Sequence, residues 1–338
     1  MMRKTIALAS VAAATLFAQT AHAETLRVSG VYAAGQSAPS EFHTLVVERF
    51  DGNEGAKFAL ELRNAIARAR IDGASYFDVR RGVGPSEDAG PTAWIVGTAF
   101  SEVEHLPAGT TEETKCVRKD EDGECLRRKT YVYECSELSV RFTGEVQMLD
   151  ARDELVYDRG FSTHGAQRYC ANDSVAPSVS AMVTGMVNQL AWQVRRDIAP
   201  IERSEDIRVL ESRKGMDRAL RKPFKKALKL TKSDWSAACI EFDRLNAMQP
   251  GNVTLTFNAG LCREVVGDLA GAEDLYRRAL ELEPGKNYPS EGLSRLASRR
   301  RAEDQLAVHF AEPEGEQYAE NNVPVGIPVM NAEAGTQK

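Results

Sequence analysis

The chain has 338 residues, of which 43% are hydrophobic and 27% are charged. This is the composition of an ordinary globular protein and gives room for two domains of about 100 to 200 residues each. The formal net charge of -6 argues against nucleic acid as a partner, despite local basic runs.

The start of the chain predicts a secretory signal peptide over residues 1–23. A basic start, an apolar run over 6–17 and the small residues Ala21-His22-Ala23 form the pattern that a signal peptidase cleaves. The apolar run is too short to cross a hydrocarbon layer of about 30 Å. We therefore expect a periplasmic protein that begins at Glu24. We expect no lipid anchor, because the first Cys of the chain is Cys116.

Residues 24–200 carry the pattern of an α/β domain. Short strand-like runs lie at 26–32, 43–50, 76–79 and 93–99. Apolar residues spaced by three and four predict amphipathic helices at 58–69 and 175–198. Two longer runs that alternate apolar and polar residues predict an antiparallel hairpin, formed by 130–149 and 155–167. This order predicts an α/β sandwich with helices over a mixed sheet.

Three phrases in this part of the chain resemble one known domain. They are Leu45-Val46-Val47-Glu48-Arg49-Phe50-Asp51-Gly52 before a helix, Trp94-Ile95-Val96-Gly97-Thr98, and the hairpin phrase from Val146 to Tyr157. Together they resemble the domain shared by the curli secretion channel protein CsgG and the amino-terminal domain of TolB. The resemblance covers about residues 26–198. It implies an α/β fold and a secretion-associated or pore-associated role at the outer membrane.

The chain has six Cys, an even number that predicts disulfides in an oxidising compartment. One pair flanks a polar turn, a second lies on consecutive strand-like runs, and a third lies on adjacent helices, where buried thiols are an alternative. In that order the pairs are Cys116 with Cys125, Cys135 with Cys170, and Cys239 with Cys262. A zinc site is the competing interpretation, and the lack of any Cys-x-x-Cys disfavours it.

After Pro200 the composition becomes strongly charged. We expect residues 201–215 to form a charged helical linker. Residues 213–232 hold nine basic residues and one acidic residue. The basic stripe from Arg218 to Lys229 predicts either a platform for an anionic envelope component, such as lipopolysaccharide phosphates, or a solvated helix face.

A four-residue signature then occurs twice, thirty-four residues apart. Its members are small, aromatic, small or apolar, and Pro: Ala238, Phe242, Leu245 and Pro250 recur as Ala272, Tyr276, Ala279 and Pro284. This period resembles the tetratricopeptide repeat (TPR), which implies an all-α domain over 216–310 that binds a protein partner. We expect these eight residues to pack between helices. We expect Asn258 and Arg263 to face the partner from the inner helix at 254–266.

Residues 311–338 lack periodicity and predict a disordered tail. The sequence shows no catalytic phrase, no metal-ligand spacing among its His residues and no dinucleotide loop, so we expect no enzyme activity, cofactor or metal. The sequence as a whole predicts an α+β protein that acts as a non-catalytic periplasmic adaptor or scaffold in cell-envelope assembly. The alternatives are a secretion or pore-associated component and a hydrolase. The sequence leaves the oligomeric state and the identity of the partner open.

Overall fold

The structure is a computed structural model that describes residues 24–81 and 91–311. The predicted signal peptide at 1–23 and all but the first residue of the predicted tail lie outside the described residues. The described chain is a mixed α+β structure with two hydrophobic cores.

The first core is built on a mixed five-stranded sheet in the order β5-β2-β6-β7-β8. Strand β2 (Thr44–Val47) is parallel to β5 (Asp78–Arg80) and to β6 (Thr92–Lys119). Strands β7 (Cys125–Leu149) and β8 (Leu155–Cys170) continue the sheet in antiparallel fashion. The predicted mixed sheet and its hairpin are therefore confirmed, although β6 extends twenty residues beyond the end of the predicted strand at 93–99.

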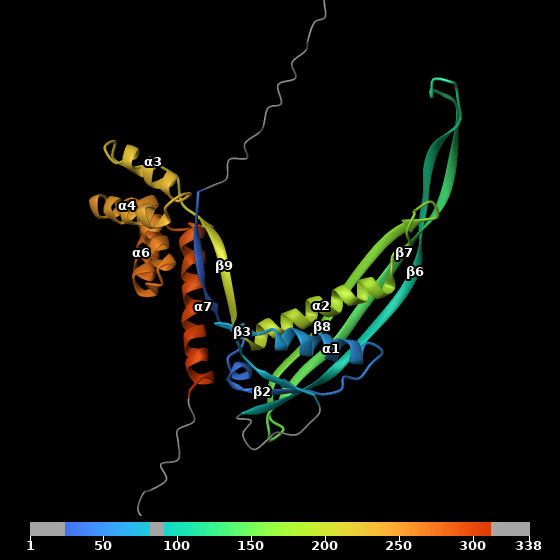
Figure 1. The fold of residues 1–338 in the computed structure, drawn as a ribbon, viewed down its shortest axis with the longest axis horizontal. Coiled ribbons are helices and arrows are strands. Elements are labelled where there is room, and N and C mark those ends of the chain that lie inside the picture. Colours follow the sequence, from blue (N-terminus) through green and yellow to red (C-terminus); the bar gives the residue numbers. More distant parts are fainter. Residues whose placement is uncertain (1–23, 82–90, 312–338) are drawn as a thin grey trace, which may run out of the picture.

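Two helices cover one face of this sheet (Figure 1). They are α1 (Gly55–Ala67) and α2 (Val179–Ile198), close to the predicted helices. Phe58 of α1 packs against Phe142 of β7 and Phe161 of β8, with ring centroids 6.2 and 5.2 Å apart. Short elements join these layers: η1 (Ala38–Glu41), β3 (Arg70–Ile71) and β4 (Ala74–Ser75).

The predicted helical linker at 201–215 is wrong. Residues Ile201–Arg208 form strand β9, which is antiparallel to β1 (Thr25–Tyr32) along its whole length. Strand β1 has alternating buried residues, Leu26 and Val28, and its backbone groups require a partner strand. The many charged residues of 201–215 led to the prediction of a helix, but a two-stranded ribbon also accommodates charged side chains on its exposed face.

The β1–β9 ribbon also moves the predicted domain boundary. Leu26 and Val28 belong to the second hydrophobic core, together with Val209 and the carboxyl-terminal helices. Although β1 is at the start of the described chain, Leu26 and Val28 pack with the helices, whereas Val31 near its end packs against the first core.

Five helices complete the second core. They are α3 (Arg221–Leu230), α4 (Trp235–Met248), α5 (Val253–Val265), α6 (Leu269–Leu282) and α7 (Asn287–His309). Side chains of Asp234, Asn252 and Asp268 cap the first turns of α4, α5 and α6 by accepting backbone N–H hydrogen bonds. Each helix packs against the next one along the chain.

The end of α7 joins the two parts of the protein. His309 is buried and stacks on Tyr76 with ring centroids 3.9 Å apart. Its ring nitrogens lie 3.0 Å from the carbonyl oxygen of Ser40 and 2.7 Å from that of Tyr76. Gln305, one turn earlier, accepts a hydrogen bond from the backbone N–H of Ala34. The helical part is thus anchored to the sheet domain by side chains near its carboxyl end.

Candidate functional site

Helix α5, predicted to present Asn258 and Arg263 to a partner, is buried on nearly all sides. The β1–β9 ribbon and α7 pack against it, so this chain fills the space in which we expected a ligand. The side-chain amide of Asn258 is fully buried. It accepts a hydrogen bond from the backbone N–H of Leu210 at 2.8 Å and donates one to the carbonyl oxygen of Leu210 at 2.9 Å.

The predicted binding role of Asn258 is therefore wrong, because both ends of its amide hold the segment that follows β9. Arg263 has 44% of its side chain exposed and forms ion pairs with Asp243 and Asp268, at 3.0 and 3.7 Å. The two residues do not share a surface that a ligand could reach. Periodicity placed both on α5 correctly, but it carried no information about which other segment would cover that helix.

The predicted packing residues of the repeat lie in the second core. Six of the eight are fully buried: Ala238, Phe242, Leu245, Ala272, Tyr276 and Ala279. The two Pro residues are exposed and follow the ends of α4 and α6. The structure thus places the signature at helix–helix contacts and at helix ends.

A buried ion pair lies beside Tyr276. The carboxylate of Glu264 is inaccessible to solvent, and the guanidinium of Arg295 binds both of its oxygens, at 2.9 and 2.7 Å. The hydroxyl of Tyr276 donates to the same carboxylate at 2.6 Å. Burial raises the pKa of Tyr276, and the nearby Glu264 charge raises it further. This network explains a fully buried acidic side chain in α5, and it fixes α7 against α5 and α6.

The most unusual surface is the distal part of the β6–β7 hairpin. Strand β8 ends at Cys170, opposite Cys135, whereas β6 and β7 continue beyond that point as a two-stranded ribbon. We call residues 108–134 the arm. Figure 1 shows the arm projecting from the sheet, away from every helix. Ten residues of β7 span about 30 Å at roughly 3.3 Å per residue.

One disulfide joins the two strands of the arm near its tip, and another joins β7 to β8 at its base. Cys135 is bonded to Cys170 at its base, and Cys116 is bonded to Cys125 near its tip. The third disulfide joins Cys239 of α4 to Cys262 of α5. The first two pairs are those expected from the sequence, and for the third the structure has the bridge rather than the alternative of two buried thiols. Disulfides of this kind are typical of proteins from oxidising compartments.

One face of the arm combines cations with tyrosines. Lys129, Tyr131 and Tyr133 alternate along β7 and so share this face. The ammonium nitrogen of Lys129 lies 5.0 Å from the ring centroid of Tyr131, and that of Lys115 lies 5.6 Å from the ring centroid of Tyr133. Glu113 accepts a hydrogen bond from Lys115, which holds the pKa of that carboxyl group below its ordinary value. The sequence predicts the disulfide at the tip but not this face, because only the strand register brings these residues together.

The predicted basic stripe lies on α3, except that Arg218 precedes the helix. Lys222, Lys225, Lys226 and Lys229 line a shallow depression of about 610 Å³, with Glu241 of α4 at its side. The clustered ammonium groups of this surface could contact an anion, which is one of the two interpretations that the sequence left open.

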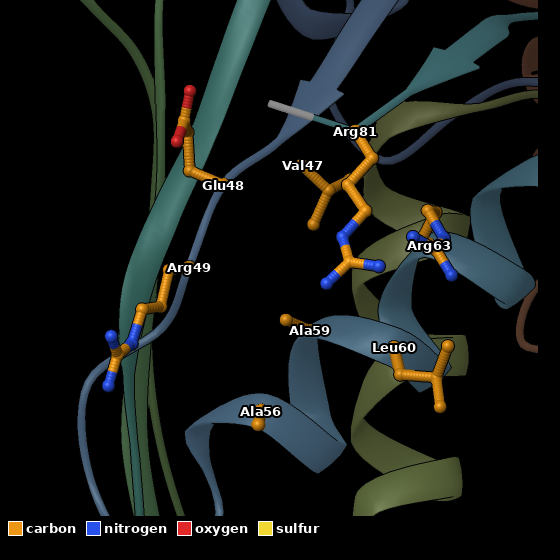
Figure 2. Close-up of a pocket in the computed structure, with 8 residues that line it drawn as sticks. All are labelled: Val47, Glu48, Arg49, Ala56, Ala59, Leu60, Arg63 and Arg81. Atoms are coloured by element: carbon orange, nitrogen blue, oxygen red, sulfur yellow. The ribbon is translucent and has the colours of Figure 1, made fainter. Parts of the chain in front are cut away.

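A second depression lies at the carboxyl ends of the parallel strands β2 and β5, where ligands of α/β sheets commonly bind. Its volume is about 570 Å³. Figure 2 shows the guanidinium groups of Arg63 and Arg81 above an apolar floor that includes Ala59 and Leu60. Arg49 points away from this space. The arrangement can hold a small anion that has an apolar portion.

Two further geometric findings bear on function. Within residues 24–81 and 91–311, no group of three or more His, Cys, Asp or Glu side chains is placed to hold a metal ion. In the same described part of the chain, no helix combines the length and apolar character needed to cross a membrane.

Comparison with known proteins does not assign a family. No protein-family model matches the sequence, and no curated protein is similar to it. Among solved structures, a neuraminyllactose-binding hemagglutinin homolog from Helicobacter pylori is similar over 47% of this chain and 82% of its own, at 11% identity and a TM-score of 0.24. The rare lipoprotein B from Shewanella oneidensis is similar over 45% of this chain and 89% of its own, at 12% identity and a TM-score of 0.19. Scores this low support no functional conclusion.

Proposed function

We propose that this protein is a non-catalytic periplasmic adaptor of the cell envelope, and that it presents the arm to a protein partner. The observation that carries the proposal is the arm itself, a ribbon that leaves the sheet at the disulfide between β7 and β8 and whose two strands are cross-linked by a second disulfide near the tip. A two-stranded ribbon without a core is only marginally stable in water. Cross-linking such a ribbon maintains a projecting shape that the rest of the fold does not require.

The arm also exposes side chains that commonly occur in protein interfaces. Val132 and Leu126 are 62% and 58% exposed. They lie on the face of β7 opposite to the one that carries Lys129, Tyr131 and Tyr133. Tyr and Arg are enriched at the centres of protein–protein interfaces. Helix α5, the inner helix of the helical part, is covered by other segments of this chain. We therefore place the partner surface on the arm and not at the groove expected from the repeat.

In this proposal the remaining parts support the arm. Helices α3 to α6 are two TPR-like units, and α7 caps them and anchors them to the sheet domain. We infer that the sheet domain corresponds to the CsgG- and TolB-like domain that residues 26–198 resemble in sequence. The signal peptide delivers the protein to the periplasm, where the three disulfides form. Osmotic shock is expected to release a protein that begins at Glu24, and retention of an uncleaved chain in the inner membrane would contradict that location.

Site-directed photo-cross-linking in living cells tests the role of the arm. A photoreactive amino acid replaces Val132 on the arm or, as a matched control, Ile240 on α4, which is 69% exposed. We expect the position on the arm to capture a discrete protein that the position on α4 does not capture. Capture from α4 alone would contradict the proposal and return the partner surface to the helical part.

A second candidate function is contact with an anionic envelope component at α3, favoured by the four lysines that line its depression. Vesicles that contain lipopolysaccharide would be expected to bind the protein less well when Lys225 and Lys229 are changed to Gln. Equal binding by the variant would exclude this surface.

A further inference from the structure

The outer edge of β7 is open along the arm. Pairing between β7 and β8 stops at Cys135 and Cys170, and the carbonyl oxygen of Glu134 still accepts a hydrogen bond from the backbone N–H of Ala171. From Cys125 to Tyr133 the described part of the chain provides β7 with only β6 as a paired strand. On the outer side the backbone N–H and C=O groups of such an edge are available to another strand. An added strand would extend the sheet in the position that β8 vacates.

The same stretch places like charges opposite each other. Lys115 is opposite Lys129, and Arg118 is opposite Arg127. Like charges directly across a ladder destabilise a sheet. Among the described residues Arg118 and Arg127 have no ion-pair partner, and Lys115 alone of the four is neutralised, by Glu113. The disulfide between Cys116 and Cys125 holds these strands together at this point.

We propose that the edge of β7 between Cys125 and Tyr133 binds an extended acidic segment of the partner as an added β-strand. The inference rests on the proposed function, which it deepens by naming the chemistry of the partner. Side chains at alternate positions of a strand lie about 7 Å apart on one face. Acidic residues at positions i and i+2 of the incoming segment would therefore lie opposite Arg127 and Lys129, which share a face of β7.

This arrangement divides recognition into two parts. Backbone hydrogen bonds to the edge supply affinity, and the two opposite-charge pairs set the register. Bound carboxylates would also relieve the repulsion between the cross-strand cations. An acidic partner segment thus compensates a feature that is unfavourable in the isolated arm.

The tip of the arm favours an acidic peptide over a lipid surface. Beyond the cations the turn carries four acidic residues, Asp120, Glu121, Asp122 and Glu124. A membrane surface that attracts the cations by its negative charge would repel this tip. A peptide that lies along the edge contacts the cations without approaching the tip.

The test uses the full-length, oxidised protein and synthetic peptides of ten residues in which Glu or Lys alternates with Val or Thr. Fluorescence anisotropy measures binding of the alternating-Glu peptide, of the same peptide N-methylated at alternate backbone nitrogens, and of the alternating-Lys peptide. We expect only the unmodified Glu peptide to bind the wild-type protein. We expect the double variant Arg127→Glu, Lys129→Glu to lose at least tenfold in affinity for the Glu peptide and to gain affinity for the Lys peptide.

Two outcomes would overturn the inference. Equal binding of the N-methylated peptide would show that charge alone, and not strand addition, drives recognition. Binding of anionic phospholipid vesicles without binding of the Glu peptide would identify a lipid surface instead. Thermal unfolding of the charge-reversed variant verifies that its body remains folded. In-cell cross-linking from Val132 separates the two proposals, because a protein captured there without any binding of the Glu peptide would refute only the acidic-strand inference.

Discussion

Replacement of Asn258 by Ala distinguishes the structure from the interpretation that the sequence favoured. If Asn258 faced a partner, its loss would weaken binding and leave stability unchanged. In the structure its amide holds both backbone groups of Leu210, at 2.8 and 2.9 Å, in a fully buried position. Asn258→Ala therefore removes two hydrogen bonds and leaves the N–H and C=O of Leu210 without these partners.

The expected loss follows from these contacts. A buried backbone group left without a partner costs about 1 to 3 kcal/mol. Leu210 is partly exposed, so each of its groups falls at the low end of this range. We expect the free energy of unfolding to fall by about 2 to 3 kcal/mol in total. The melting temperature should fall by about 5 to 10 °C, at roughly 2 to 4 °C per kcal/mol for a unit of this size.

Thermal unfolding followed by circular dichroism measures this change, and amide hydrogen exchange at Leu210 locates it. Arg263→Ala is the matched control on the same helix, because its side chain is 44% exposed and its ion pairs lie at the surface. We expect the control to cost less than about 1 kcal/mol. An Asn258→Ala protein with wild-type stability would refute the role of the amide as a clamp on Leu210.

Three other predictions concern the disulfides, the buried ion pair and the titration of His309. Replacing Cys135 and Cys170 by Ala should lower the free energy of unfolding by about 3 to 4 kcal/mol, because that bridge closes a loop of 35 residues. Replacing Cys116 and Cys125 by Ala should only loosen the arm, so equal melting temperatures of the two double variants would contradict this prediction. Glu264→Gln should lower the free energy of unfolding in denaturant by about 3 to 5 kcal/mol, because the buried Arg295 loses its carboxylate partner. The control Glu283→Gln, at an ion pair on the surface, should change it by under about 1 kcal/mol. A small loss in both variants would exclude a structural role for the buried pair. Burial lowers the pKa of His309 below its ordinary value, despite hydrogen bonds to two carbonyl groups, and His43 lowers it further. The stabilising contribution of neutral His309 is therefore complete above about pH 6.5 and is lost as the pH falls through its lowered pKa. Between pH 7 and pH 5 the melting temperature should drop by less in His309→Gln than in wild type. Identical pH profiles of the two proteins would refute this prediction.

Short-range features of the fold were determined by the sequence alone. The alternation in 130–149 and 155–167 predicted the hairpin, and the three- and four-residue spacing predicted α1, α2 and the helices that carry the repeated signature. Two disulfide pairs also followed from the sequence, because each Cys lies on an element whose neighbour in the chain is its neighbour in space. For Cys239 and Cys262 the sequence left a bridge and buried thiols open, and the structure has the bridge. These patterns are local, and neighbouring residues along one element suffice to express them.

The tertiary structure alone decided which surfaces are covered. Strand β9 pairs with β1, about 175 residues earlier in the chain, and no local pattern in 201–208 distinguishes that strand from a charged helix. The same long-range pairing brings Leu210 to Asn258 and so converts an expected binding residue into a structural one. The arm was left open for a related reason, because β8 ends at Cys170 while β6 and β7 continue. Whether a residue is buried depends on which distant segments of the chain pack against it. The sequence alone therefore predicts the helices and strands of this protein better than it predicts which of their faces remain exposed to a partner.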